Sequence, residues 1–213
     1  MTFAPLQALA ETLLPHAFEP VADGAHDLSH LQRVWRNARR ISDQEGGKLR
    51  VLLAATLLHD CVALEKNSPL RAQASRLAAD KARGILAGLD WPADEIDAVA
   101  HAIAAHSFSA NIAPVTLEAK IVQDADRLDA LGALGVARTF YVAGRLGRPL
   151  YDPADPLAQQ RELDDRQFSL DHFQAKLLHL AEGFQTAAGA RLAQVRQQRL
   201  QRFYQELLEE IGQ

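Results

Sequence analysis

The sequence predicts an all-α fold. Apolar residues recur at helical spacing along most of the chain, and no segment alternates convincingly between apolar and polar residues as a strand would. The 213 residues are 48% hydrophobic and 23% charged, a composition typical of a globular protein. A chain of this length is long enough for one well-packed domain. We therefore expect a single domain over residues 1–213, with a core at about 26–145 and C-terminal helices at about 170–211 packed on it.

Helix start and stop signals divide the chain into segments. Asp27 is a suitable N-cap, Ser68-Pro69 and Thr116 are further start signals, and Gly46-Gly47 are expected to end a helix. The predicted helices cover about residues 6–14, 27–43, 49–61, 68–88, 92–106, 116–145, 170–181 and 184–211. Between the predicted helices 116–145 and 170–181, residues 147–166 contain several prolines and acids and form the longest predicted loop, a candidate lid.

Composition excludes several classes of protein. The net charge of −4 gives no electrostatic reason to expect a standing nucleic-acid partner. The single cysteine excludes an internal disulfide and a cysteine-based zinc site, and it suits a reducing compartment. Residues 1–15 lack the basic start of a signal peptide, and no apolar run is long enough to span a membrane. We expect a cytoplasmic protein without a membrane partner, either a monomer or a homodimer.

The pair His59-Asp60 follows a run from Val51 to Leu58 that contains no charged residue. A helix that is apolar on all sides is normally central and buried, and its carboxyl end favours a cation. An isolated pair of this kind is more often structural than functional. A metal site at this pair would require further ligands from elsewhere in the chain.

Two more polar residues lie on predicted core-facing stripes. His30 falls in the first turn of the helix predicted from residue 27, beside its inward face, and Asp126 lines up with the apolar Val122 and Ala130. An acid on such a stripe is costly to bury unless a cation or hydrogen bonds receive it. Two imidazoles and two carboxylates would form a mixed nitrogen and oxygen site, suited to Mn²⁺, Mg²⁺, Fe²⁺, Ni²⁺ or Zn²⁺.

His30, His59-Asp60 and Asp126 resemble the H…HD…D signature of the HD-domain metal-dependent phosphohydrolases. Longer segments resemble the small stand-alone bacterial branch of the YedJ/YpgQ type. They are residues 26–34, Lys66-Asn67 after the His-Asp pair, 105–109, 121–130, and Asp171-His172-Phe173 with Lys176-Leu177. The resemblance thus covers most of the chain, and the ordered series is far more specific than a bare His-Asp pair.

The resemblance implies an HD-type helical bundle with one divalent metal ion. Mn²⁺ or Mg²⁺ is the expected ion, and Fe²⁺, Ni²⁺ and Zn²⁺ are the alternatives. It implies His30, His59, Asp60 and Asp126 as the metal ligands. The implied activity is a nucleotide pyrophosphohydrolase that converts a ribo- or deoxyribonucleoside triphosphate to the monophosphate and pyrophosphate, through attack by a metal-bound hydroxide. The alternatives are a 5′-nucleotidase, a phosphodiesterase, or a non-catalytic nucleotide-sensing HD module. The motif is not followed by Gly-Tyr-Pro, which argues against the cyclic-dinucleotide phosphodiesterases.

Further residues are candidates for catalysis or substrate binding. Asp60, His26 and Lys66 are the candidate catalytic residues. The candidate substrate contacts are His26, Arg33, Lys66, His106, Arg127 and Lys176. Two of these have structural alternatives: His106 lies on an inward stripe and would equally suit a buried structural histidine, and Arg127 would also suit a pair with Asp124 or Glu118.

Overall fold

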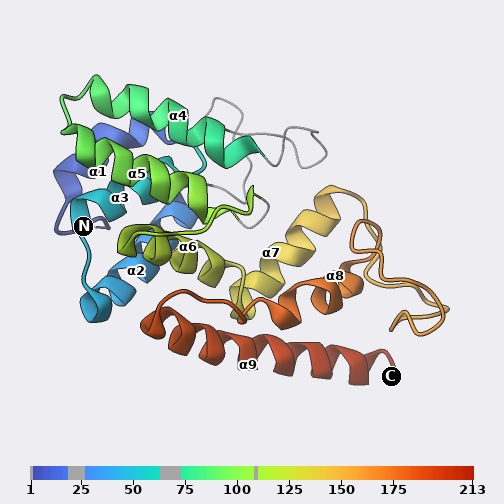
Figure 1. Cartoon of the computed structure of the whole chain (residues 1–213). Helices are drawn as coiled ribbons and strands as arrows, with labels where there is room; N and C mark the ends of the chain where they lie inside the picture. The colour runs from blue at the N-terminus through green and yellow to red at the C-terminus, as the bar shows by residue number, and fades with distance from the viewer. Residues whose placement is uncertain (1, 19–26, 63–72, 108–109) are drawn as a thin grey trace. The chain divides into compact units, whose positions relative to one another are not determined.

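The computed structural model describes residues 2–18, 27–62, 73–107 and 110–213 (Figure 1). Within these ranges the regular structure is helical and contains no strand, which confirms the predicted all-α class. The helices are, in chain order, α1 Gln7–Leu13, α2 Leu28–Glu45, α3 Leu49–Leu58, α4 Ala74–Ala87, α5 Ala93–His106, α6 Leu117–Asp129, α7 Gly132–Arg145, α8 Ser169–Ala175 and α9 Ala187–Glu210, with 3-10 turns η1 Leu14–His16 and η4 Leu177–His179.

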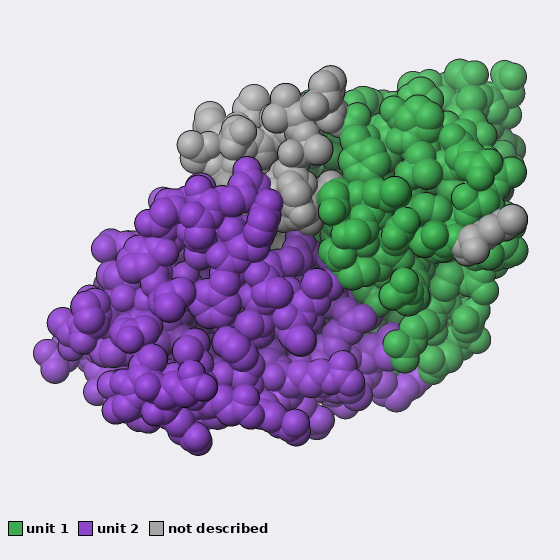
Figure 2. Space-filling model, turned by 180° about the vertical axis from the view of Figure 1, so that it is seen from behind, with its two compact units in different colours: residues 1–126, 185–189 green, residues 127–184, 190–213 purple. Residues whose placement is uncertain are grey.

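The chain forms two compact units, which Figure 2 distinguishes by colour. The first consists of Met1–Asp126 and Gln185–Gly189, and the second of Arg127–Phe184 and Ala190–Gln213. The first unit is therefore discontinuous in sequence. The expectation of a single domain over residues 1–213 stays a prediction.

Helix α3 is the centre of the first unit. All of its residues from Val51 to Leu58 are buried, and it packs against α1, α2, α4 and α5. Helices α4 and α5 lie side by side (Figure 1). The prediction of a central buried helix is thus confirmed, although α3 ends at Leu58, three residues before the predicted end. The site residues that follow Leu58 consequently lie in the turn after the helix.

The caps of the first unit follow the sequence signals. The Asp27 carboxylate accepts a hydrogen bond from the His30 backbone N–H at 3.0 Å, which caps α2. Gly46 ends that helix with a φ of +89°, a conformation that favours glycine. The Thr116 hydroxyl accepts from the Ala119 N–H at the start of α6. The predicted start of α4 at Ser68-Pro69 falls outside the described residues.

The single helix predicted over residues 116–145 is wrong. The chain breaks between α6 and α7, where Leu131 is extended and Gly132 has a φ of +72°. At Gly135 a Cβ atom would lie 2.2 Å from the Ala130 carbonyl oxygen, so the turn and the start of α7 approach too closely for a side chain. The predicted helix over 170–181 likewise divides into α8 and η4 at Lys176.

The second unit has an aromatic core. The rings of Phe140, Phe173, Phe203 and Tyr204 pack with centroids 5.7 to 6.1 Å apart. The candidate lid, residues 147–166, is tied to α8 by Arg161, whose guanidinium donates to both carboxylate oxygens of the buried Asp171 at 2.5 and 2.9 Å. Its function as a lid stays a prediction.

Candidate metal centre

His59 is oriented by the carboxyl end of α3. It follows Leu58 in the helical conformation and is 1% exposed. Its Nδ1 lies 2.8 Å from the Thr56 carbonyl oxygen. Because a carbonyl only accepts hydrogen bonds, Nδ1 carries the proton and Nε2 of the neutral ring presents its lone pair. The local backbone thus fixes which nitrogen of His59 is available as a ligand.

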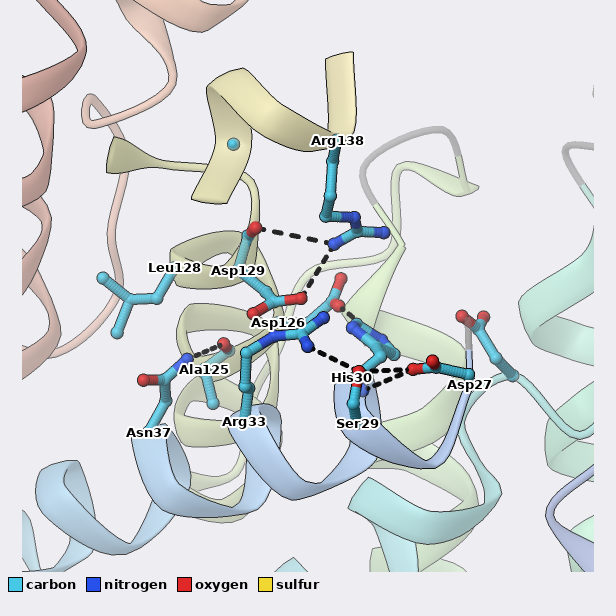
Figure 3. Close-up of polar contacts among 12 residues, drawn as sticks. Asp27, Ser29, His30, Arg33, Asn37, Ala125, Asp126, Leu128, Asp129 and Arg138 are labelled. Carbon is cyan, nitrogen blue, oxygen red and sulfur yellow. Dashed lines mark hydrogen bonds and ion pairs between the residues drawn. The ribbon is translucent and has the colours of Figure 1, made fainter. Parts of the chain in front are cut away.

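The remaining predicted ligands converge on that nitrogen. His30 Nε2 lies 3.3 Å from His59 Nε2, and Asp60 Oδ2 lies 3.4 Å from it. Asp126 Oδ1, from α6, is 3.6 Å from His30 Nε2 and 3.8 Å from His59 Nε2. Figure 3 shows His30 and Asp126 facing each other across α2 and α6. Structure therefore brings together the four side chains that the sequence proposed as metal ligands.

The cluster fits a divalent cation. Ligand atoms from His30, His59 and Asp60 all lie within 4.8 Å of one another. With bonds of about 2.1 Å, two ligands are separated by about 3.0 Å at a right angle and about 3.4 Å at a tetrahedral angle. The observed separations of 3.3 to 3.8 Å are close to these values. A proton would neutralise the repulsion between one pair of these acceptors only, whereas a cation satisfies all of them.

The two kinds of ligand differ in exposure. His30 and His59 are each 1% exposed, whereas the side chains of Asp126 and Asp60 are 28% and 37% exposed. The imidazoles thus form the buried side of the cluster and the carboxylates the side that reaches solvent. Asp126 had been expected on a buried stripe, and its partial exposure corrects that expectation.

His106 joins the same group of side chains from the end of α5. It is 7% exposed, its Nδ1 donates to the Ile103 carbonyl oxygen at 2.6 Å, and its Nε2 lies 3.7 Å from Asp60 Oδ1. Burial, together with the neighbouring His59, lowers the pKa of His106 and outweighs the opposing effect of Asp60 and Asp126. A neutral ring whose Nδ1 is protonated leaves Nε2 as an acceptor next to the Asp60 carboxylate.

Arg33 lies one turn after His30 on α2 and is half-buried. Its guanidinium donates to the Ser29 hydroxyl at 2.7 Å, and that hydroxyl donates to the Asp27 carboxylate at 2.6 Å (Figure 3). These hydrogen bonds hold the Arg33 guanidinium at the first turn of α2, the turn that also carries His30.

Four further predicted site residues remain, His26, Lys66, Arg127 and Lys176. His26 and Lys66 lie outside the described residues. Arg127 and Lys176 belong to the second compact unit, where Arg127 donates to the Gly183 carbonyl oxygen at 3.0 Å and Lys176 is exposed at the end of α8.

The buried acid Asp124 has a structural role that the sequence pattern does not indicate. Asp124 is 0% exposed, and its carboxylate accepts from the backbone N–H groups of Gln185 and Thr186 at 2.8 Å and from the Thr186 hydroxyl at 2.7 Å. The carboxylates of Asp124 and Asp126 therefore serve different partners. No local signal identifies donors that lie about sixty residues further along the chain.

Comparisons with known proteins agree with this geometry. The family model described as HD domain matches residues 27–131. YpgQ from Bacillus subtilis (strain 168) is 32% identical over 190 residues, which cover 87% of this chain and 84% of YpgQ. The chain belongs to the HD-domain family.

Solved structures show that the chain has the fold of the HD-superfamily hydrolases. The crystal structure of an HD-superfamily hydrolase from Bacillus thuringiensis has 35% sequence identity and a TM-score of 0.72, covering 97% of this chain and 98% of that one. The crystal structure of Bacillus subtilis YpgQ in complex with ADP has 29% identity and a TM-score of 0.72, covering 97% of each chain. Separately, no helix among the described residues is long and apolar enough to cross a membrane.

Proposed function

We propose that this protein is a divalent-metal-dependent phosphohydrolase that acts on nucleotides. The observation that carries the proposal is the convergence of four acceptor side chains, His30, His59, Asp60 and Asp126, at separations suited to one cation. Such a cation would lower the pKa of a coordinated water and neutralise phosphoryl oxygens. Mn²⁺ or Mg²⁺ is the proposed metal.

The residues of the chain would divide the work between metal and substrate. The imidazoles of His30 and His59 would bind the metal ion on the buried side of the cluster. The carboxylates of Asp60 and Asp126 would bind it on the side that reaches solvent. His106, with its lowered pKa, would face the substrate as a neutral acceptor beside Asp60. Arg33, held by Ser29, would offer a cation for phosphate.

A nucleoside triphosphate is the proposed substrate, with nucleoside monophosphate and pyrophosphate as products. A water would lose a proton to solvent as its oxygen bonds to the α-phosphorus. The bond from that phosphorus to the bridging oxygen would break, and its electron pair would leave with pyrophosphate. The complex of YpgQ with ADP supports a nucleotide ligand for this branch of the family. His26, Lys66, Arg127 and Lys176 remain proposed substrate contacts, with His26 and Lys66 also as proposed catalytic residues.

The test combines metal analysis with a substrate panel. Purified protein with Mn²⁺ or Mg²⁺ would be incubated with nucleoside triphosphates, monophosphates and a cyclic nucleotide, and the products separated by chromatography. Pyrophosphate release supports the proposal, phosphate from monophosphates indicates a 5′-nucleotidase, and opening of the cyclic nucleotide indicates a phosphodiesterase. Binding of metal and nucleotide without turnover would indicate a sensing module.

Variants connect the activity to the cluster. Asp126→Ala and His59→Ala should each abolish bound metal and turnover, because each removes a proposed ligand. The control is Asp43→Asn, at an acid on α2 whose side chain is 62% exposed and pairs with Arg39. Retention of metal by Asp126→Ala at the wild-type level would refute the proposed centre.

A further inference from the structure

Two buried amide side chains connect the helices of the candidate metal centre. Asn37 on α2 donates from Nδ2 to the Ala125 carbonyl oxygen of α6 at 3.0 Å, as Figure 3 shows. Gln123 on α6 donates from Nε2 to the Ala105 carbonyl oxygen of α5 at 2.7 Å. Both side chains are 3% exposed. The bonds therefore lie in the interior of the first unit and link α2 to α6 and α6 to α5.

The acceptors occupy equivalent places in the sequence. Ala125 immediately precedes Asp126, and Ala105 immediately precedes His106. A peptide group is planar, so the carbonyl of one residue and the N–H and Cα of the next move together. A hydrogen bond to the Ala125 carbonyl thus restrains the plane that carries Asp126, and the bond to the Ala105 carbonyl restrains the plane that carries His106.

The end of α5 depends on this contact. The last carbonyls of an α-helix have no partner within the helix. Ala105 is the penultimate residue of α5, and Ser107, which follows the helix, is extended. Gln123 supplies a donor from another helix at that point. Gln123, three positions before Asp126 on α6, thus contacts the backbone that carries His106.

The Gln123 amide is poorly suited to stabilising the core alone. Its Oε1 is buried and has no hydrogen-bond partner within the described part of the chain. Leaving a buried acceptor unsatisfied costs free energy, and this cost offsets much of what the donor bond contributes. An apolar side chain of similar size would fill the space without that cost. The donor bond to Ala105 is therefore the contribution that an apolar residue could not replace.

We propose that Asn37 and Gln123 are positioning residues of the proposed hydrolase. Asn37 holds Asp126 against His30 and His59, and Gln123 holds His106 against Asp60. Asn37 lies seven residues after His30, two turns along the same face of α2. One helix thus supplies both a metal ligand and the amide that aligns another. The inference rests on the function proposed above.

Three variants test the proposal. Asn37→Leu and Gln123→Met remove each amide while keeping its approximate volume. Gln197→Met is the matched control, because Gln197 also donates to a backbone carbonyl at 2.7 Å (Leu178), is 7% exposed, and has a buried Oε1 without a partner among the described residues. The melting temperature, the Kd for Mn²⁺ by calorimetry, and kcat and KM for the best nucleotide are measured on each.

The expected results differ between the variants. Asn37→Leu should raise the Kd for Mn²⁺ about tenfold, the lower end of the usual effect when a residue that orients a metal ligand is removed. Gln123→Met should lower kcat/KM about tenfold and change the Kd for Mn²⁺ by less than about threefold, because His106 is not a proposed ligand. Gln197→Met should leave the Kd for Mn²⁺ and kcat/KM at their wild-type values. If Gln123→Met does not fold, Gln123→Asn, whose shorter amide does not reach Ala105, replaces it.

The outcomes separate the two proposals. Wild-type protein that neither binds Mn²⁺ nor hydrolyses any nucleotide overturns the proposed function, and this inference with it. Active wild-type protein, with all three variants losing melting temperature and keeping wild-type Kd and kcat/KM, overturns the positioning role alone. Weaker Mn²⁺ binding in Asn37→Leu, together with lower kcat/KM at nearly unchanged Mn²⁺ affinity in Gln123→Met, would support the positioning role.

Discussion

His59 and His106 are held by the same local contact: the Nδ1 of each ring donates to the backbone carbonyl three residues earlier, and the two rings lie 4.8 Å apart at an angle of 82°. Each imidazole is therefore oriented by the carboxyl end of its own helix, α3 or α5. The two histidines differ in the surroundings of Nε2. That atom faces His30, Asp60 and Asp126 in His59, and Asp60 in His106.

Exchanging these histidines should therefore have different effects. His59→Gln should abolish metal binding at the proposed site, because it removes the proposed ligand whose Nε2 lies within 3.8 Å of the other three. His106→Gln should retain the metal and lower kcat/KM at least about tenfold, since it removes a group beside the ligands. Metal content by mass spectrometry and nucleotide hydrolysis measure the two effects. Loss of metal from His106→Gln would make His106 a ligand instead.

Removal of divalent metal should destabilise the fold. Without a cation the acceptor atoms of His30, His59, Asp60 and Asp126 repel one another at 3.3 to 3.8 Å. A ligand present at a hundred times its Kd stabilises the native state by about 2.7 kcal/mol. The melting temperature should therefore fall after chelation and recover on addition of Mn²⁺. Asp126→Ala provides the control, and an equal response to Mn²⁺ in that variant would contradict the site.

Two glycine substitutions should change stability in opposite directions. At Gly189 a Cβ atom would lie 2.4 Å from Asp124 Oδ2, a carboxylate held by three hydrogen bonds. Gly189→Ala should therefore destabilise the protein by about 1–3 kcal/mol. Gly84 is exposed within α4 and has no atom within 4 Å of the added Cβ, so Gly84→Ala should stabilise by about 0.5–1 kcal/mol. Urea unfolding compares the two, and changes of equal sign would refute the steric argument.

The loop over residues 147–166 should respond to acid through Asp155. The backbone N–H groups of Gln160 and Gln159 donate to its carboxylate at 2.8 Å and lower its pKa below the usual 3.8. Because the pKa is depressed in the folded state, the stabilising contribution is present above pH 3.8 and is lost as the pH falls through the folded value. The amide resonances of Gln159 and Gln160 should titrate with that lowered pKa. Asp155→Asn should remove the titration.

Local signals were sufficient for much of the first unit. Asp27 and Gly46 mark the ends of α2, and the apolar run from Val51 to Leu58 identifies the buried α3, because capping and periodicity are properties of neighbouring residues. The break between α6 and α7 could not be recognised, since most of its residues suit a helix and the departure lies in the backbone conformations of Leu131 and Gly132. Such a departure depends on packing rather than on propensity.

The candidate site shows the same division. Periodicity placed His30 and His106 on inward faces, where the structure has them buried. It assigned the costly buried acid to Asp126, which is 28% exposed, whereas Asp124 on the same helix is fully buried and takes its donors from Gln185 and Thr186. The hydrogen bonds of Asn37 and Gln123 could not be predicted for the same reason, because their acceptors lie on other helices. Contacts made at long sequence separation are not encoded in local spacing.

The pairing of Asp124 with the residues before α9 limits how the chain can be shortened. Residues 27–131 match the family model, yet the three donors that neutralise this buried carboxylate come from residues 185 and 186, and the backbone N–H of Ala188 donates to Glu45 at the end of α2. A fragment truncated after residue 131 would enclose a negative charge without its donors. An autonomous minimal protein would have to carry residues 185–189 as well, rejoined through an engineered linker.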